Sequence, residues 1–196
     1  MPREYGAQID PESLAVTSAT HDAPLQNGGL LTDRGRLLAG LAFVLGLATI
    51  LGAWGSQIIG GLVPCELCLE QRLAYYWGLP ILALVLILWN RLPRTVLLIG
   101  LLLTAAVFVW STYMASYHAG VELKFWPGPT ACTGTGVDVS FSDLSNLNAT
   151  RVVPCDAIQF QLFGITLAGF NAIISAAIVL ALLVAAAISG RKASSR

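Results

Sequence analysis

The sequence predicts an all-α integral membrane protein, in which a four-transmembrane-helix bundle carries its cysteines on two outward loops. Three observations support this fold class. Hydrophobic residues make up 56% of the 196 residues and charged residues only 11%, whereas a soluble domain has about 25% charged residues. Four long runs of the chain are almost entirely apolar. Most of the basic residues flank these runs on one predicted side of the membrane.

Each of the four apolar runs is predicted to cross the membrane as a helix, since crossing hydrocarbon takes about 20 apolar residues. Residues 37–59 form the first run and contain no charge. Residues 73–89 form a shorter run, which Pro80 is expected to kink. Residues 95–117 and 165–189 complete the set, again without a charge.

The basic residues orient these spans. Eight of the 11 Lys and Arg residues lie beside the predicted inner side: Arg3, Arg34, Arg36, Arg91, Arg94, Arg191, Lys192 and Arg196. Arg72, Lys124 and Arg151 lie on the other side. Cytoplasmic loops carry the excess of Lys and Arg, so both termini are predicted to be cytoplasmic. The loops 60–72 and 118–164, with all four cysteines, then face outward.

The domain organisation follows from these spans. Residues 37–190 are predicted to form one membrane domain. Residues 1–36 are polar, mixed in charge and rich in Ser, Thr, Pro and Gly, which predicts a disordered cytoplasmic tail. Residues 191–196 form a short cytoplasmic tail at the other end.

The segment PCELCLEQR, residues 64–72, places two thiols directly before the second predicted span. A thiol in a C-x-x-C pair has a lowered pKa near a helix N-terminus or a cation. The dipole of the second helix would point at Cys65 and Cys68. Arg72 follows Cys68 by four positions and shares a helical face with it. These features favour a redox-active dithiol, although Arg72 is equally consistent with an interfacial anchor.

The second cysteine pair, Cys132 and Cys155, has a different setting. Cys132 lies in the segment GPTACTGTG, whose proline and glycines do not support a helix. This segment is expected to be extended, mobile and exposed. A disulfide in such a segment is open to attack by the thiolate of another protein.

Four cysteines could also bind zinc or form static disulfides. A structural zinc site usually combines two short cysteine knuckles, but here only one exists and no histidine is near it in the sequence, so no metal is expected. Two static disulfides that tie the outer loops together remain an alternative.

Three segments resemble the bacterial disulfide-bond formation protein B (DsbB) family of membrane thiol:quinone oxidoreductases. PCELCLEQR is similar to that family's first outward loop, including the arginine. YHAGVELKFWPGPTAC (117–132) and VPCDAIQFQLFGITLAGFN (153–171) resemble the exit of its third span and the entry to its fourth. The number of spans, their orientation and the order of the cysteines agree as well. The resemblance extends over residues 37–190.

The resemblance implies a path for electrons. A periplasmic thioredoxin-fold dithiol oxidase (DsbA-like) would reduce a Cys132–Cys155 disulfide, with the mixed disulfide at Cys132. Cys155 would pass the electrons to Cys65, and Cys68 would meet a bound quinone, either ubiquinone or menaquinone, assisted by Arg72. The location implied is the bacterial inner membrane.

The resemblance also places His118 close to a histidine that the family has near its quinone pocket. A partly buried interfacial histidine is the alternative for this position. Gln71 stands where some members of the family have an acidic residue, a difference that is not expected to matter.

Other classes of function were compared with this one. A membrane scaffold with static loop disulfides is the main alternative, and the reactivity of the disulfides distinguishes the two. A small transporter would require ionisable residues within the spans, and the four runs contain no charged residue. The formal net charge of zero gives no support to a nucleic-acid partner.

Overall fold

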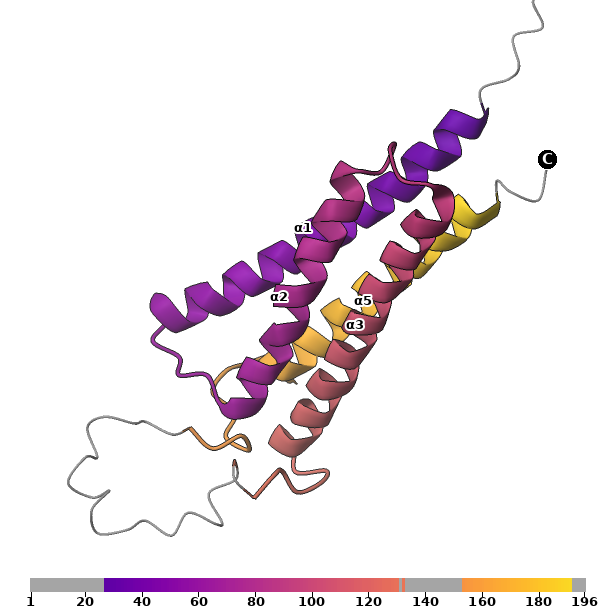
Figure 1. The fold of residues 1–196 in the computed structure, drawn as a ribbon. Helices are drawn as coiled ribbons and strands as arrows, with labels where there is room; N and C mark the ends of the chain where they lie inside the picture. The colour runs from indigo at the N-terminus through magenta and orange to yellow at the C-terminus, as the bar shows by residue number, and fades with distance from the viewer. Residues whose placement is uncertain (1–26, 131, 133–152, 192–196) are drawn as a thin grey trace, which may run out of the picture.

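The structure is a computed structural model that describes residues 27–130, 132 and 153–191, with side chains from Arg34 onward. The regular elements among these residues are four long helices, labelled in Figure 1, and a two-stranded hairpin. Their bounds are α1 Asn27–Ile58, α2 Glu66–Ile87, α3 Arg94–Glu122, β1 Gln161–Leu162, β2 Ile165–Thr166 and α5 Leu167–Arg191. The described residues leave out most of the predicted N-terminal tail (1–26), part of the second outward loop (131 and 133–152) and most of the predicted C-terminal tail (192–196).

Three of the four helices are long and apolar enough to cross a membrane: Arg34–Ile58, Arg94–Glu122 and Leu167–Arg191. The prediction of a multi-pass helical membrane protein is confirmed to this extent. Helix α2 is not among the three, because charged residues occupy its first two turns. The crossing of the membrane by α2 stays a prediction.

Several helices extend beyond the apolar runs that predicted them, and α1 and α3 do so in ways that matter for the site. Helix α1 begins at Asn27, so it includes residues that were predicted to belong to a disordered tail. Helix α3 continues past residue 117 to Glu122. An apolar run marks only the part of a helix that hydrocarbon covers, and nothing at these ends breaks the backbone hydrogen bonding. The extension of α3 places His118 and Glu122 on a regular helix.

The helices pack in a closed cycle. Helix α5 packs against α1 and α3, and α2 packs against the same two helices. Phe108, fully buried on α3, meets the ring of Tyr75 edge-on at 5.2 Å between centroids. A Cβ atom added to Gly78 would lie 2.8 Å from the Phe108 ring. Gly78 therefore permits α2 and α3 to approach closely, as small residues do between membrane helices.

The two ends of the bundle differ. At one end, the start of α1 lies beside the end of α5, where a Cβ atom on Gly35 would lie 2.8 Å from Ser189. At the other end lie the segments that carry the cysteines (Figure 1).

A short hairpin leads into α5. Phe163 and Gly164 form its turn and both have positive φ, 51° and 79°, as in the turns that suit the twist of paired strands. Thr166 then caps α5, because its hydroxyl accepts the Gly169 N–H at 3.1 Å. The hairpin thus sets where α5 begins, and Asn171 follows in its first turns.

Candidate active site

The first thiol pair lies at the start of α2. Cys65 is the N-cap residue, with φ −77° and ψ 173°, and its sulfur accepts the backbone N–H of Cys68 at 3.3 Å. Both cysteines are free thiols, and their sulfurs are 2.7 Å apart. A disulfide bond is about 2.05 Å long, so the pair needs little movement to close.

The two thiols differ in acidity. The hydrogen bond from the Cys65 thiol lowers the pKa of Cys68, and the Arg72 guanidinium acts in the same direction while burial opposes it. The same hydrogen bond, together with burial, raises the pKa of Cys65. Cys68 is therefore the sulfur that carries a negative charge when one proton is lost.

The second pair, Cys132 and Cys155, forms a disulfide with its Cα atoms 5.3 Å apart. The Cys155 N–H donates to the Cys132 carbonyl at 2.7 Å. The expectation of an exposed disulfide is wrong for this structure, since Cys132 is 5% and Cys155 1% exposed. The pair is buried because it shares one apolar cluster with the first thiol pair. This sulfur cluster consists of Cys65, Leu67, Cys132 and Cys155, with Cys68, Met114 and Tyr117 packed against it.

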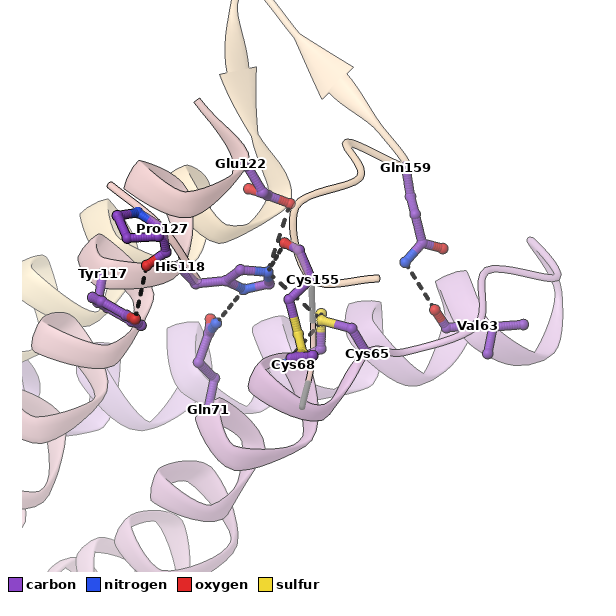
Figure 2. The surroundings of a disulfide bond; sticks show 11 residues. Val63, Cys65, Cys68, Gln71, Tyr117, His118, Glu122, Pro127, Cys155 and Gln159 are labelled. Carbon is purple, nitrogen blue, oxygen red and sulfur yellow. Dashed lines mark hydrogen bonds and ion pairs between the residues drawn. A yellow bond between two sulfur atoms is a disulfide. The ribbon is translucent and has the colours of Figure 1, made fainter. Parts of the chain in front are cut away.

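His118 lies beside both cysteine pairs (Figure 2). Its Nε2 is 3.6 Å from the Cys65 sulfur and 3.2 Å from the Cys155 carbonyl oxygen. Its Nδ1 is 2.7 Å from the side-chain nitrogen of Gln71. The histidine is 2% exposed, so it is not the partly buried interfacial residue that the sequence also allowed. Its contacts join the two pairs rather than a lipid surface.

Arg72 ties α2 to the end of α1. Its guanidinium donates to the Gln57 side chain at 2.7 Å and to the Ala53 carbonyl at 3.2 Å. Arg72 and Cys68 line the same cavity. The residue therefore has both the position of an anchor and access to the interior of the site.

The cavity that Cys68 and Arg72 line is the first of two. It has a volume of about 380 Å³ and lies between α1, α2 and α5. Its polar lining includes Cys68, Gln71, Arg72, Tyr75, His118, Glu122 and Asn171, and its apolar lining includes Ile50, Phe160, Leu167, Phe170 and Ile174. An apolar hollow with a few converging polar groups is typical of a small-molecule site.

A second cavity, of about 340 Å³, lies on the other side of the start of α2. Cys132 lines it together with Glu66, Leu67, Glu70, Trp110, Tyr113, Met114, Tyr117 and Pro129. The two cysteine pairs therefore each contribute one residue to a cavity, Cys68 to the first and Cys132 to the second.

The sequence interpretation missed several polar residues of the site. Gln71 was judged unimportant, yet it holds His118. Glu122 lies one helical turn after His118, with 3.9 Å between Oε1 and Nε2, and its Oε2 has no hydrogen-bond partner among the described residues. The sequence signal for Asn171 was its polar amide side chain within the predicted apolar run 165–189.

The structure also brings together three groups that are able to bind a metal ion. Cys65, Cys68 and His118 offer ligand atoms within 4.8 Å of one another. Spacing along the chain did not indicate this cluster, because His118 is 50 positions beyond Cys68. A structural zinc ion usually takes four ligands, and this cluster of described residues supplies three.

The unequal acidity of the two thiols leads to the first prediction. Near pH 7, iodoacetamide should alkylate Cys68 about tenfold faster than Cys65. Cys68 keeps its thiolate down to its lowered pKa, whereas the thiolate of Cys65 forms only as the pH rises through its raised pKa. Peptide mass spectrometry over a pH series measures both. In Cys65→Ala the labelling of Cys68 should move to higher pH, and faster labelling of Cys65 in the wild type would contradict the assignment.

Comparison with known proteins agrees with this geometry. No curated protein and no solved structure matches the chain. The family model described as disulfide bond formation protein DsbB matches residues 35–185, which include most of the three apolar helices, both cysteine pairs and His118. The chain therefore belongs to the DsbB family of membrane proteins that act in disulfide bond formation.

Proposed function

We propose that this protein is a thiol:quinone oxidoreductase of the bacterial inner membrane. It reoxidises a periplasmic thioredoxin-fold dithiol oxidase (DsbA-like) and passes the electrons through its two cysteine pairs to a membrane quinone. One observation carries the proposal. Both pairs lie in one buried sulfur cluster, and Cys68 of the first pair lines an apolar cavity with a cation beside it.

The electron path consists of thiol–disulfide exchanges. The partner's dithiol reduces the Cys132–Cys155 disulfide, with the mixed disulfide at Cys132. Cys155 then exchanges with Cys65, so that the first pair becomes a dithiol and the second pair a disulfide. Oxidation of the Cys65 and Cys68 thiols back to a disulfide releases two electrons and two protons.

The first cavity suits a quinone headgroup. When bound, a quinone accepts the two electrons and two protons that the dithiol releases. Arg72 supplies a fixed positive charge beside Cys68, because a guanidinium stays protonated at any working pH. Ile50 on α1 and Leu167, Phe170 and Ile174 on α5 supply the apolar part of the lining.

The energetics also favour a quinone as acceptor. A strongly oxidising periplasmic dithiol oxidase has a potential of about −120 mV. A glutathione pool at about −200 mV would be about 80 mV too reducing, which is about 3.7 kcal/mol uphill for two electrons. A quinone that respiration renews in the membrane supplies the missing oxidising power.

The burial of the second disulfide favours one other candidate function. A membrane scaffold with static loop disulfides would bury Cys132 and Cys155 in this way. The discriminating measurement is reactivity, because a redox-active pair is reduced by a dithiol partner and reoxidised by added quinone, whereas a static disulfide is not. For the oxidoreductase, the segment around Cys132 must open before the partner reaches the sulfur.

Orientation is the second prediction. Both termini should be cytoplasmic and the Cys132 segment periplasmic, because basic residues gather at the end of the bundle that holds the start of α1 and the end of α5. An impermeant thiol reagent added outside reduced spheroplasts should label Cys132. Labelling from the cytoplasm alone would exclude reaction with a periplasmic partner.

The partner contact is the third prediction. Cys155→Ala leaves Cys132 as a free thiol, whose thiolate should attack the disulfide of the oxidised partner. The bond between Cys132 and the partner forms, the partner's second sulfur leaves as a thiolate, and no Cys155 thiol is present to displace the partner from Cys132. Non-reducing electrophoresis and peptide mapping identify the adduct, and Cys132→Ala is the matched control that should yield none at this site. An adduct at Cys65 or Cys68 would contradict the order of electron flow.

Arg72 provides the fourth prediction, which also tests the function. Mixing the purified protein anaerobically with reduced partner and a quinone should lead to quinone reduction, followed by absorbance. Arg72→Ala should lower kcat/KM for quinone by about 100-fold, as removal of a charge-stabilising donor does. Arg72→Lys should keep about a tenth of the activity, since it retains the charge but loses the planar fork.

A control separates the charge of Arg72 from its role as an anchor. Gln57→Ala removes the acceptor that holds the guanidinium but keeps the cation. It should change kcat/KM less than threefold, roughly the effect of one exposed polar contact. Equal losses in Gln57→Ala and Arg72→Ala would show that Arg72 acts only by tethering α1, and quinone turnover like wild type in Arg72→Ala would exclude both roles.

A further inference from the structure

A chain of hydrogen bonds leads from the core of the bundle to His118, and the direction of its donors follows from one backbone atom. The carbonyl oxygen of Cys155 accepts hydrogen bonds and cannot donate them. His118 Nε2 lies 3.2 Å from this oxygen, so Nε2 must carry a proton. In a neutral imidazole the other nitrogen, Nδ1, is then an acceptor.

This assignment determines which atom donates and which accepts in each of the following contacts. Gln71 must present its NH₂ group to His118 Nδ1, at 2.7 Å. Its oxygen therefore faces Asn171 and accepts from the Asn171 NH₂ group at 2.6 Å. The Asn171 oxygen then accepts from the Tyr75 hydroxyl at 2.5 Å. Every donor in this chain points toward His118.

Three of the four side chains in this chain of hydrogen bonds are buried, and Asn171 is half-buried. Tyr75, Gln71 and His118 are 3%, 6% and 2% exposed. The Tyr75 oxygen is also 3.1 Å from the Ser175 hydroxyl, which anchors the far end of the chain in the core. Buried networks whose members are all satisfied are rigid. A proton added to Nδ1 would face the NH₂ group of Gln71 and break the contact.

We propose that Tyr75, Asn171 and Gln71 are positioning residues that hold His118 in its neutral Nε2–H tautomer, with that N–H directed at the two cysteine pairs. The inference rests on the proposed function for its role in turnover. His118 then acts as a hydrogen-bond donor to sulfur during the exchange between the pairs, and not as the base that removes a thiol proton.

The exchange step shows why a donor is needed there. The Cys132 thiolate attacks Cys155 in a Cys65–Cys155 disulfide, the Cys132–Cys155 bond forms, and the electron pair of the broken bond leaves on Cys65. No electron or proton leaves the four sulfurs in this step. The Nε2–H group lies 3.6 Å from the sulfur that receives the charge, and a hydrogen bond to a charged group is stronger than one to a neutral group.

The ring protonation can be observed directly. The chain contains two histidines, His21 and His118, so a His21→Ala background leaves one imidazole. In full-length protein labelled with ¹⁵N-histidine in lipid nanodiscs, NMR distinguishes a protonated ring nitrogen from an unprotonated one. We expect a protonated Nε2 and an unprotonated Nδ1 in this background, in the absence of partner and quinone.

Two variants test the chain itself. Gln71→Glu keeps the size of the side chain and the acceptor for Asn171, but it offers His118 only an acceptor, so Nδ1 should become protonated. Asn171→Leu releases the Gln71 amide, so both tautomers should appear. Thr112→Val is the matched control on α3. Among the described residues the Thr112 hydroxyl donates only to the Phe108 carbonyl of its own helix, so the ring signals of His118 should not change in this variant.

A rate measurement connects the tautomer to turnover. Without quinone, reduced partner should convert the oxidised protein to the Cys65–Cys68 dithiol, followed by acid quench and alkylation. Asn171→Leu should slow this conversion about tenfold, the effect of losing a hydrogen bond to a charged sulfur. Thr112→Val should not slow it.

The outcomes separate this inference from the proposed function. A protonated Nδ1 in the His21→Ala background, or ring signals that neither Gln71→Glu nor Asn171→Leu changes, would overturn the inference even if quinone is reduced normally. Failure of the wild type to reduce quinone would instead overturn the proposed function, while the tautomer result would still stand as a property of the site.

Discussion

The start of α2 at Cys65 is the constraint on which the rest of the site depends. The Cys65 sulfur caps the helix by accepting the Cys68 N–H. Cys68, Gln71 and Tyr75 then follow at spacings of three, three and four residues, which places them on one helix face. This face carries both thiols, the amide that holds His118 and the hydroxyl that begins the donor chain. A shift of the helix start by one residue would rotate the face by about 100° and separate these groups.

The sequence predicted the parts of the site that are local in the chain. The C-x-x-C pair, Arg72 at the next turn and the helix after Cys65 are all visible within nine residues. The pairing of Cys132 with Cys155 came from the family resemblance, not from spacing. Gln71 and Asn171 are 100 positions apart. Their contact crosses the bundle between α2 and α5, which both pack against α1 and α3, and no local pattern specifies it.

Two differences from the sequence predictions have the same cause. The glycines and proline around Cys132 predicted an exposed segment, but the apolar surface of Leu67, Met114 and Tyr117 covers the disulfide. Similarly, the apolar run of the third span ended at residue 117, but α3 continues and places His118 against Gln71 of α2 and the Cys155 carbonyl. Local composition describes what a segment does in isolation, whereas tertiary contacts decide what it does beside three other helices.

The burial of the sulfur cluster has a consequence for the order of the proposed reaction. Cys68 lines the first cavity and Cys132 lines the second, with Cys65 and Cys155 between them. In the proposed reaction the partner would act on Cys132 at the second cavity, and the quinone would occupy the first cavity beside Arg72. Electrons must pass through the exchange at Cys65, where His118 contacts both pairs. The donor chain from Tyr75 thus acts at the one step that connects the two sides of the site.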